Sequence, residues 1–448
     1  MTESKIKAVH EASGKIFADG SILDLVRAAD GEINFVIWDG KFARTTPEFV
    51  RNGERYIPLR TAAMIGRWLQ LPRETADYKS TRELFTKISA LISQVTQARN
   101  DVVDLLTFFV LSTWLCDWLP SAPFLWIVSP PTTSAGPLQQ LMTLLCRRAL
   151  VVTADSLADF RSHAVDLQPT LVTEVFEPTR RLLNLLRTST RRGALTAVSG
   201  KFVDASNAIV VFAREPLRDP ASAGFPLELV LSATPDYMPR LSASKAEQIA
   251  AEYQAELLHY RLRSLAKVQA PKFELSQFTV PIREIAFNLG ACVVDDEELQ
   301  AQLVPLLKPA DREARVGYAS LLTAIVLEVL LARCHTATGK YFAVTDICKD
   351  VNTVLRARGD VTELSPEKVG WTLRALGLRT EFILGGRKGL VLSDDVRKKI
   401  HDLALAYGVR TLRQLPEKPQ CPLCAALSLP WKMEASATGA SHENAGNH

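Results

Sequence analysis

Apolar and polar residues change their spacing several times along this chain of 448 residues, and each change indicates a different kind of structure. Between residues 21 and 58, short apolar runs alternate with the turn signals Asp30-Gly31, Asp39-Gly40 and Asn52-Gly53. This pattern predicts a small β-rich module. From Thr81 to Leu119 the apolar residues recur at helical spacing, as expected for helices that pack against a core.

Through the centre of the chain, apolar runs of strand length alternate with stretches of helical periodicity. This alternation predicts an α/β fold with a sheet of parallel type. The strand candidates are residues 124–128, 149–153, 170–174, 208–213 and 227–231. Helical spacing then dominates in residues 244–268, 281–307 and 317–334. These helices fit either a lid over a nucleotide site or a purely structural bundle.

The segment from Ser129 to Gly136 reads S-P-P-T-T-S-A-G and lies between the first strand candidate and an amphipathic stretch from Leu138 to Leu150. Strand, turn and helix are the layout of a phosphate-binding loop, in which backbone N–H groups cradle phosphates. A lysine there reaches the terminal phosphates, and a Ser or Thr holds Mg²⁺. In this chain the lysine position holds Ala135, and the metal-holding hydroxyl is replaced by Gly136. The candidate nucleotide-facing residues are Ser129, Thr132, Thr133, Ser134, Ala135 and Gly136.

The missing lysine leaves two interpretations of this loop. Backbone N–H groups at a helix N-terminus attract anions without any lysine, so weak ATP binding is compatible with the sequence. Alternatively, the segment is a plain strand-to-helix turn that never bound a nucleotide.

A second nucleotide-handling motif is expected where the chain reads P-T-L-V-T-E-V-F-E, from Pro169 to Glu177. Glu174 takes the position of a metal-associated carboxylate, and Val175 takes the position of the carboxylate that activates water. Because valine cannot accept a proton, general-base catalysis from that position is excluded. Glu177 is the one nearby carboxylate that could substitute.

Together with these two motifs, four further segments resemble bacterial P-loop proteins of the AAA+ or phage-helicase-like kind. They begin at Phe17 (F-A-D-G-S), Tyr78 (Y-K-S-T-R-E-L-F), Arg214 (R-E-P-L) and Ile400 (I-H-D-L-A). The resemblance covers residues 18–424 and implies an N-terminal module, a P-loop NTPase-like (AAA+/RecA-like) core and a C-terminal winged helix. Members with an intact site read G-P-P-G-S-G-K-T and I-D-E where this chain reads S-P-P-T-T-S-A-G and T-E-V.

The resemblance also implies an arginine finger near Gly224, which would stabilise charge on a transferred phosphoryl group. The stretch A-G-F-P-L-E around that glycine contains no arginine. Lysine, metal hydroxyl, general base and arginine finger serve one reaction, and all four are missing. We therefore expect a catalytically inactive core in a scaffold or regulator that is not an enzyme, linked by the resemblance to replication or mobile elements.

Two rival hypotheses remain open. One is a divergent active ATPase or helicase that uses Glu174 or Glu177 for metal and water. The basic residues that could replace its lysine are Arg147, Arg148 and Arg214. The other is a protein-interaction adaptor that binds no nucleic acid. An inactive core could also form an oligomer with itself or with an active ATPase relative.

Residues 340–413 follow the element order of a winged helix, which is helix, turn, helix and β-hairpin. Helical spacing predicts helices over residues 344–358 and 365–376, and a hairpin over residues 379–392 around G-G-R-K-G. On the second helix, Lys368, Trp371 and Arg374 share one face. The side predicted to be buried consists of Val369, Leu373 and Leu376.

Charge supports a nucleic-acid role for this segment. It carries 14 Lys or Arg against 9 Asp or Glu, a net charge of +5, whereas the whole chain sums to +4. A basic helix face suits a major groove, and a basic hairpin suits phosphate contacts, so we expect double-stranded DNA as the partner. The residues expected to contact it are Lys368, Trp371, Arg374, Arg379, Arg387 and Lys388. A protein-docking module and a purely structural domain are the alternatives.

Seven cysteines are scattered along the chain without the spacing of a disulfide framework. Cys421 and Cys424 form a C-x-x-C pair, which suits either a zinc ion or two free thiols. A four-ligand zinc site would need two more ligands, and His401 or His442 would have to be recruited. No other cofactor is expected.

These patterns divide the chain into five parts. They are residues 1–70 (β-rich module), 71–240 (P-loop-like core), 241–339 (helical region), 340–413 (winged helix) and 414–448 (C-x-x-C and disordered tail). The N-terminus lacks a signal-peptide pattern. The longest apolar candidate, residues 103–120, is interrupted by Asp104 and Asp117. We therefore expect a cytoplasmic protein without a membrane partner.

Overall fold

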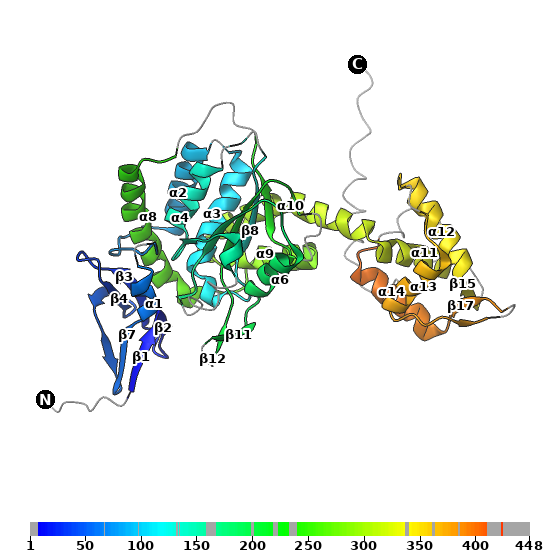
Figure 1. Cartoon of the computed structure of the whole chain (residues 1–448), viewed down its shortest axis with the longest axis horizontal. Coiled ribbons are helices and arrows are strands. Elements are labelled where there is room, and N and C mark those ends of the chain that lie inside the picture. The colour runs from blue at the N-terminus through cyan, green and yellow to red at the C-terminus, as the bar shows by residue number, and fades with distance from the viewer. Residues whose placement is uncertain are drawn as a thin grey trace, which may run out of the picture. The chain divides into compact units, whose positions relative to one another are not determined.

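A computed structural model describes residues 8–66, 68–96, 98–130, 133, 135–157, 167–198, 201–217, 223–232, 240–336, 340–360, 363–383, 386–409 and 423. The chain forms two compact units, residues 1–310 and residues 311–448 (Figure 1). Within the described residues, no helix combines the length and the apolar character that a membrane crossing requires.

Two small β-sheets open the first unit. One has the order β1-β7-β6 (Ala8–Ala12, Glu54–Pro58 and Phe49–Arg51). The other is an antiparallel meander of β2 (Gly14–Ile16), β3 (Ile22–Arg27), β4 (Ile33–Trp38) and β5 (Ala43–Thr46). Turns fall where the sequence predicts them, because Gly31, Gly40 and Asn52 adopt positive φ angles. The hydrophobic cluster beneath β3 and β4 includes Leu150 and Leu167 from the central part of the chain.

The centre of the first unit is a five-stranded sheet in which all neighbouring strands are parallel, as the alternating pattern predicts. Its order is β14-β8-β13-β10-β9. The strands are β8 (Phe124–Val128), β9 (Leu150–Val151), β10 (Leu171–Val175), β13 (Ile209–Ala213) and β14 (Leu227–Val230). Because parallel strands share one direction, their carboxyl ends meet at one edge, where open α/β sheets bind ligands.

Helices lie on both sides of this sheet (Figure 1). A group that packs together comprises α2 (Thr81–Thr96), α3 (Asn100–Trp114), α4 (Gly136–Leu145) and α8 (Ala243–Ser264). From α6 (Arg180–Ser189), Leu186 joins Trp126 and Val211 of the sheet in a second hydrophobic cluster. The unit also contains α1 (Arg60–Met64), the hairpin β11 (Leu195–Val198) and β12 (Lys201–Asp204), and the short 3-10 turns Cys116–Trp118, Ala154–Ser156, Leu265–Lys267 and Leu275–Gln277. The hairpin was not predicted.

The helix predicted over residues 281–307 is wrong as a single element. Helix α9 spans Val280–Gly290, and after a break a separate helix, α10, spans Glu297–Ser320. A side chain at Gly290 would lie 2.9 Å from Pro271, so the close packing there requires glycine. The carboxylate of Asp296 then accepts a hydrogen bond from Leu299 N at 2.9 Å and starts the new helix.

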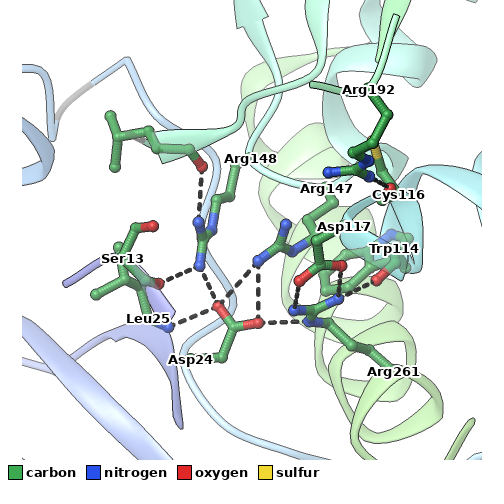
Figure 2. Close-up of polar contacts among 11 residues, drawn as sticks. Ser13, Asp24, Leu25, Trp114, Cys116, Asp117, Arg147, Arg148, Arg192 and Arg261 are labelled. Carbon is green, nitrogen blue, oxygen red and sulfur yellow. Dashed lines mark hydrogen bonds and ion pairs between the residues drawn. The ribbon is translucent and has the colours of Figure 1, made fainter. Parts of the chain in front are cut away.

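A buried cluster of charges joins β3 to the helical layer (Figure 2). The carboxylate of Asp24 accepts hydrogen bonds from Arg261 Nε at 2.5 Å, from Arg147 Nη2 at 3.2 Å, and from Arg148. Arg261 also donates from Nη1 and Nη2 to both oxygens of Asp117, at 2.6 and 2.5 Å. Three guanidinium groups therefore share two carboxylates.

The arginines keep both carboxylates ionised. Burial alone would raise the pKa of Asp24, but the attraction of the three arginines outweighs it and holds that pKa well below its usual range. The pKa of Asp117 is likewise low, because Arg261 and Arg147 outweigh the effect of burial. Burial, together with the repulsion of Arg147, lowers the pKa of Arg148 to about 10, so Arg148 stays charged at neutral pH.

The described part of the second unit contains the end of α10, four further helices and a small sheet. Its elements are α11 (Leu322–Thr336), β15 (Tyr341–Ala343), α12 (Val344–Ala357), α13 (Pro366–Ala375), β16 (Glu381–Phe382), β17 (Lys388–Val391) and α14 (Asp394–Ala406). The three strands pair antiparallel in the order β15-β17-β16. Helices α12 and α13 correspond to those predicted over residues 344–358 and 365–376. They share one hydrophobic cluster with α11, α14 and β17.

Candidate functional site

The loop after β8 lies at the carboxyl edge of the parallel sheet. Ser129 is buried, and its Oγ lies 2.6 Å from Thr133 Oγ1. Thr133 Oγ1 in turn donates to the carbonyl oxygen of Pro130 at 2.7 Å, and its backbone N–H donates to the same oxygen at 2.9 Å. These side chains therefore bond within the turn. Thr132 and Ser134 lie outside the described residues.

Helix α4 begins directly after this loop, at Gly136, so the strand, turn and helix of the predicted layout are all present. Its N-terminus is a poor anion site. Ala135 provides no side-chain cap, and Pro137 in the first turn has no N–H to donate. The sequence prediction did not take Pro137 into account, although this proline directly follows Gly136, the position expected to hold the metal-binding hydroxyl.

A basic side chain approaches the start of α4 from a distant part of the chain. A Cβ added to Gly136 would lie 3.4 Å from Nε of Arg240. Leu241, the residue next to Arg240, is held in place by two reciprocal hydrogen bonds. Leu241 N donates to Gln140 Oε1 at 2.8 Å, and Gln140 Nε2 donates to Leu241 O at 3.1 Å. Arg240 was missed because no sequence pattern links it to the loop.

Glu174 lies on the outer end of β10 and is exposed, as is Glu177. Oε1 of Glu174 is 3.8 Å from Nη2 of Arg214, which follows the neighbouring strand β13. Arg214 also lies 3.5 Å from the carbonyl oxygen of Ser129. Val175 is buried in the hydrophobic cluster beneath α6, so its position faces the core. The structure thus brings together Ser129, Glu174 and Arg214 at one edge.

Two of the three arginines considered as replacements for the lysine are excluded by their positions. Arg147 and Arg148 follow the opposite end of α4 and are buried in the cluster around Asp24. Of these three arginines, Arg214 is the one that reaches the sheet edge. The expected place of an arginine finger, Gly224, has a φ of +89°, and an added Cβ would lie 3.3 Å from the backbone of Arg187. That position cannot hold a larger residue without rearrangement.

The arrangement lacks a metal centre in the described part of the chain. Within those residues, no group of three or more His, Cys, Asp or Glu side chains is placed to hold a metal ion. Cys421, Cys424 and His442 lie outside the described residues.

The face of α13 predicted to read DNA is open to solvent. Lys368, Trp371 and Arg374 are exposed, and 68% of the Trp371 surface is accessible. The opposite side is buried, as predicted, in the hydrophobic cluster of the unit: Val369, Leu373 and Leu376. The helix begins at Ser365, whose Oγ accepts a hydrogen bond from Lys368 N at 3.4 Å, and Pro366 occupies its first turn.

The hairpin β16–β17 adds a second exposed basic surface. Arg379, Arg387 and Lys388 are exposed on and beside it. Lys388 pairs with Phe382 across the two strands, its Nζ lies 5.9 Å from the centre of the Phe382 ring, and 76% of the Phe382 surface is accessible. No salt bridge joins these three basic side chains, or Lys368 and Arg374, to a carboxylate among the described residues.

No family model and no curated protein matches this chain. Solved structures with a partial likeness include the SCCmec type IV Cch active helicase, with 11% identity over 88% of this chain and 80% of its own, at a TM-score of 0.44. The apo C-terminal region of NrS-1 has 11% identity over 83% of this chain and 97% of its own, at a TM-score of 0.36. Cdc6p from Pyrobaculum aerophilum has 12% identity over 68% and 94%, at a TM-score of 0.20. Each of these is a likeness in backbone arrangement at low sequence identity.

Proposed function

We propose that this protein is a DNA-associated scaffold or regulator, built on a P-loop-like core that does not hydrolyse ATP. Its second unit acts as a winged helix that binds double-stranded DNA. The observation that carries the proposal is the exposed face of Lys368, Trp371 and Arg374 on α13, next in sequence to a basic hairpin. If Lys368 and Arg374 were paired with carboxylates, this face would be an ordinary solvated surface and would not indicate a binding site.

In this proposal each part of the unit has a role. Helix α13 enters the major groove, where Lys368 and Arg374 donate to base edges or phosphates and Trp371 makes apolar contact with bases. Arg387 and Lys388 on the hairpin contact phosphates, which fix the register of the protein without reading sequence. The DNA sequence preference, if any, therefore depends on α13.

The core supports an inactive ATPase more readily than an active one. The loop has no lysine, Pro137 removes one helix N–H, and Val175 faces the hydrophobic interior. A substrate phosphate would meet few donors, and no general base follows β10 at the required position. The core then serves as a fixed frame that forms an oligomer with itself or with an active ATPase relative, in replication or mobile-element biology. ATP binding would be weak.

A direct test is a titration of labelled duplex and single-stranded DNA with the full-length protein at several salt concentrations. The proposal expects duplex binding whose affinity falls steeply as salt rises, because neutralised phosphates release counterions. Absence of binding even at low salt would eliminate the DNA role and favour a protein-interaction adaptor.

A divergent active ATPase is the second candidate, and one observation favours it. Arg240 at the start of α4 and Arg214 beside Glu174 bring positive charge to the sheet edge that the loop itself lacks. This candidate predicts Mg²⁺-dependent ATP turnover that disappears in a Glu174→Ala, Glu177→Ala double variant. Equal turnover in the variant and the parent protein would exclude these carboxylates.

A further inference from the structure

An aromatic ring is open to solvent on the hairpin of the second unit. Phe382 ends β16, and 76% of its surface is accessible, more than for Trp371 on α13. Among the large apolar side chains in the described part of this unit, Phe382 is the most exposed. A single exposed apolar side chain is common on protein surfaces, so its surroundings decide whether it indicates a contact.

The strand pairing places the ring on the helix side of the small sheet. Side chains alternate along β17, so Lys388 shares a face with Leu390, which is fully buried in the hydrophobic cluster that includes α13. Phe382 pairs with Lys388 across the two strands and therefore lies on the same face. Because Phe382 is exposed, the hairpin carries its ring beyond the edge of that cluster.

Packing on the other face holds the hairpin together. Ile383 continues the strand pairing, because its N–H donates to the carbonyl oxygen of Arg387 at 2.8 Å. A Cβ added to Gly389 would lie 2.7 Å from Cδ1 of Ile383 and 2.9 Å from the carbonyl oxygen of Phe342. The side chain of Ile383 thus packs closely over the backbone of β17. The ring of Phe382 is presented by a paired and packed hairpin.

Positive charge lies beside the exposed ring. Nζ of Lys388 is 5.9 Å from the ring centre, within the reach of a cation–π interaction, and Arg387 is exposed next to it. The carboxylate on these two strands belongs to Glu381, which alternation places on the opposite face. A flat apolar ring with neighbouring cations matches a nucleotide, which joins an apolar base face to a phosphate.

The base that meets this ring has to be unpaired. Inside a duplex the base faces are covered by stacking, and only base edges are open in the grooves. With α13 in the major groove, the minor groove is left for the hairpin, but that groove is only about 6 Å wide. Two strands lie about 4.8 Å apart before their side chains are counted, so the hairpin is too wide to enter. An unpaired base has a free face that stacks on an aromatic ring.

We propose that Phe382 stacks on an unpaired base next to a duplex held by α13, so that the protein recognises junctions between single-stranded and double-stranded DNA. This inference rests on the duplex binding proposed above. Arg387 and Lys388 contact phosphates of the unpaired strand, which position the base on the ring.

The test is fluorescence anisotropy of the full-length protein with three labelled DNAs. They are a blunt duplex, the same duplex with an unpaired tail on each strand at one end, and the tailed duplex with abasic nucleotides in both tails. The two tailed DNAs carry the same phosphates and differ only in the bases. The parent protein should bind the base-containing tails about 5- to 150-fold more tightly than the abasic tails, the range expected for stacking of one base.

Substitution of the ring separates stacking from other contacts. Phe382→Ala should abolish the difference between the two tailed DNAs and keep the parent's affinity for the blunt duplex, whereas Phe382→Trp should retain the difference. Phe42→Ala is the matched control, because Phe42 is 74% exposed but lies in the first unit, and it should behave as the parent does. The denaturation midpoint of Phe382→Ala should equal that of the parent, since the ring is exposed.

The possible failures of the two proposals are distinguishable. If the parent binds the blunt duplex but binds base-containing and abasic tails equally, junction recognition is overturned and duplex binding stands. If Phe382→Ala weakens binding to all three DNAs by the same factor, the ring contacts the duplex itself, and junction recognition is again overturned. If the parent does not bind the blunt duplex even at low salt, duplex binding fails, and junction recognition fails with it.

Discussion

Arg261 of α8 donates a hydrogen bond from Nε to the carboxylate of Asp24 on β3 at 2.5 Å, although the two residues are 237 positions apart in the sequence. Figure 2 shows this pair at the centre of the buried cluster. The pair joins the N-terminal meander to the helical layer of the sheet. Because Asp24 and the three arginines are buried, these charges depend on one another and on Asp117 for solvation.

Replacing Asp24 with alanine should strongly destabilise the first unit. The change leaves Arg147 and Arg148 buried without their carboxylate, and such uncompensated charges typically cost about 3–5 kcal/mol. The free energy of unfolding, measured by chemical denaturation of the full-length protein, should fall by that amount. A matched control is Asp19→Ala, which removes an exposed carboxylate paired with Arg51 and should have a small effect.

Replacement of Arg147 should destabilise the first unit much less than replacement of Asp24. Arg147 Nη1 makes no hydrogen bond within the described residues, and Arg147 is the third positive charge against two carboxylates. Arg147→Met should therefore cost far less than Asp24→Ala. A loss of stability equal to that of Asp24→Ala would mean that Arg147 is as necessary to the cluster as Asp24.

Stability should depend on pH in the acid range. Asp24 and Asp117 have pKa values well below the usual 3.8, so the unfolded chain binds their protons at a higher pH than the folded chain does. Their contribution is complete above about pH 5 and is lost as the pH falls through the lowered pKa values. The free energy of unfolding should decrease on acidification, with a smaller slope in Asp117→Asn. An unchanged slope in Asp117→Asn would show that the Asp117 carboxylate does not contribute to the pH dependence of stability.

The parallel sheet could be predicted from sequence because its buried strands are short apolar runs, such as Phe124–Val128. The charge cluster could not, since its members come from four separate elements. One signal was available: Asp24 interrupts the apolar run I-L-D-L-V, and a carboxylate inside a buried strand requires a partner. Nothing in the sequence, however, indicated that Arg240 would approach Gly136, because long-range packing of residues 240–241 against α4 decides that contact.

Trp371→Ala should weaken duplex binding without weakening the fold. The side chain is 68% exposed, so its removal should change the free energy of unfolding by no more than about 0.5 kcal/mol. The loss of an aromatic contact with bases should reduce DNA affinity by about 1–3 kcal/mol. Binding and denaturation curves on one preparation separate these effects. Trp68→Ala is the control, because Trp68 is 57% exposed but lies in the first unit.

Restoring the missing groups of the loop tests whether its layout is that of a nucleotide site. The double variant Ala135→Lys, Gly136→Thr supplies a charged donor and a metal-holding hydroxyl, and a hydrogen bond from a charged group contributes about 1.5–3 kcal/mol. Calorimetric titration with Mg²⁺ and ATP should therefore show an affinity at least about tenfold higher. The control is Ala135→Met, Gly136→Thr, which adds similar bulk without the charge. Equal affinities for the two variants would favour a plain turn.

We propose that the second unit binds duplex DNA through α13 and the hairpin. Fluorescence anisotropy should compare the parent protein with a variant in which Lys368, Arg374, Arg387 and Lys388 are alanine. A control variant removes four exposed basic residues of the first unit: Lys41, Arg44, Arg60 and Lys245.

We expect the α13 and hairpin variant to bind more weakly at low salt, with a salt slope smaller by about 0.9 for each phosphate contact that is lost. The control variant should keep the parent's affinity and slope. Equal affinity and an unchanged salt slope in the α13 and hairpin variant would contradict the account.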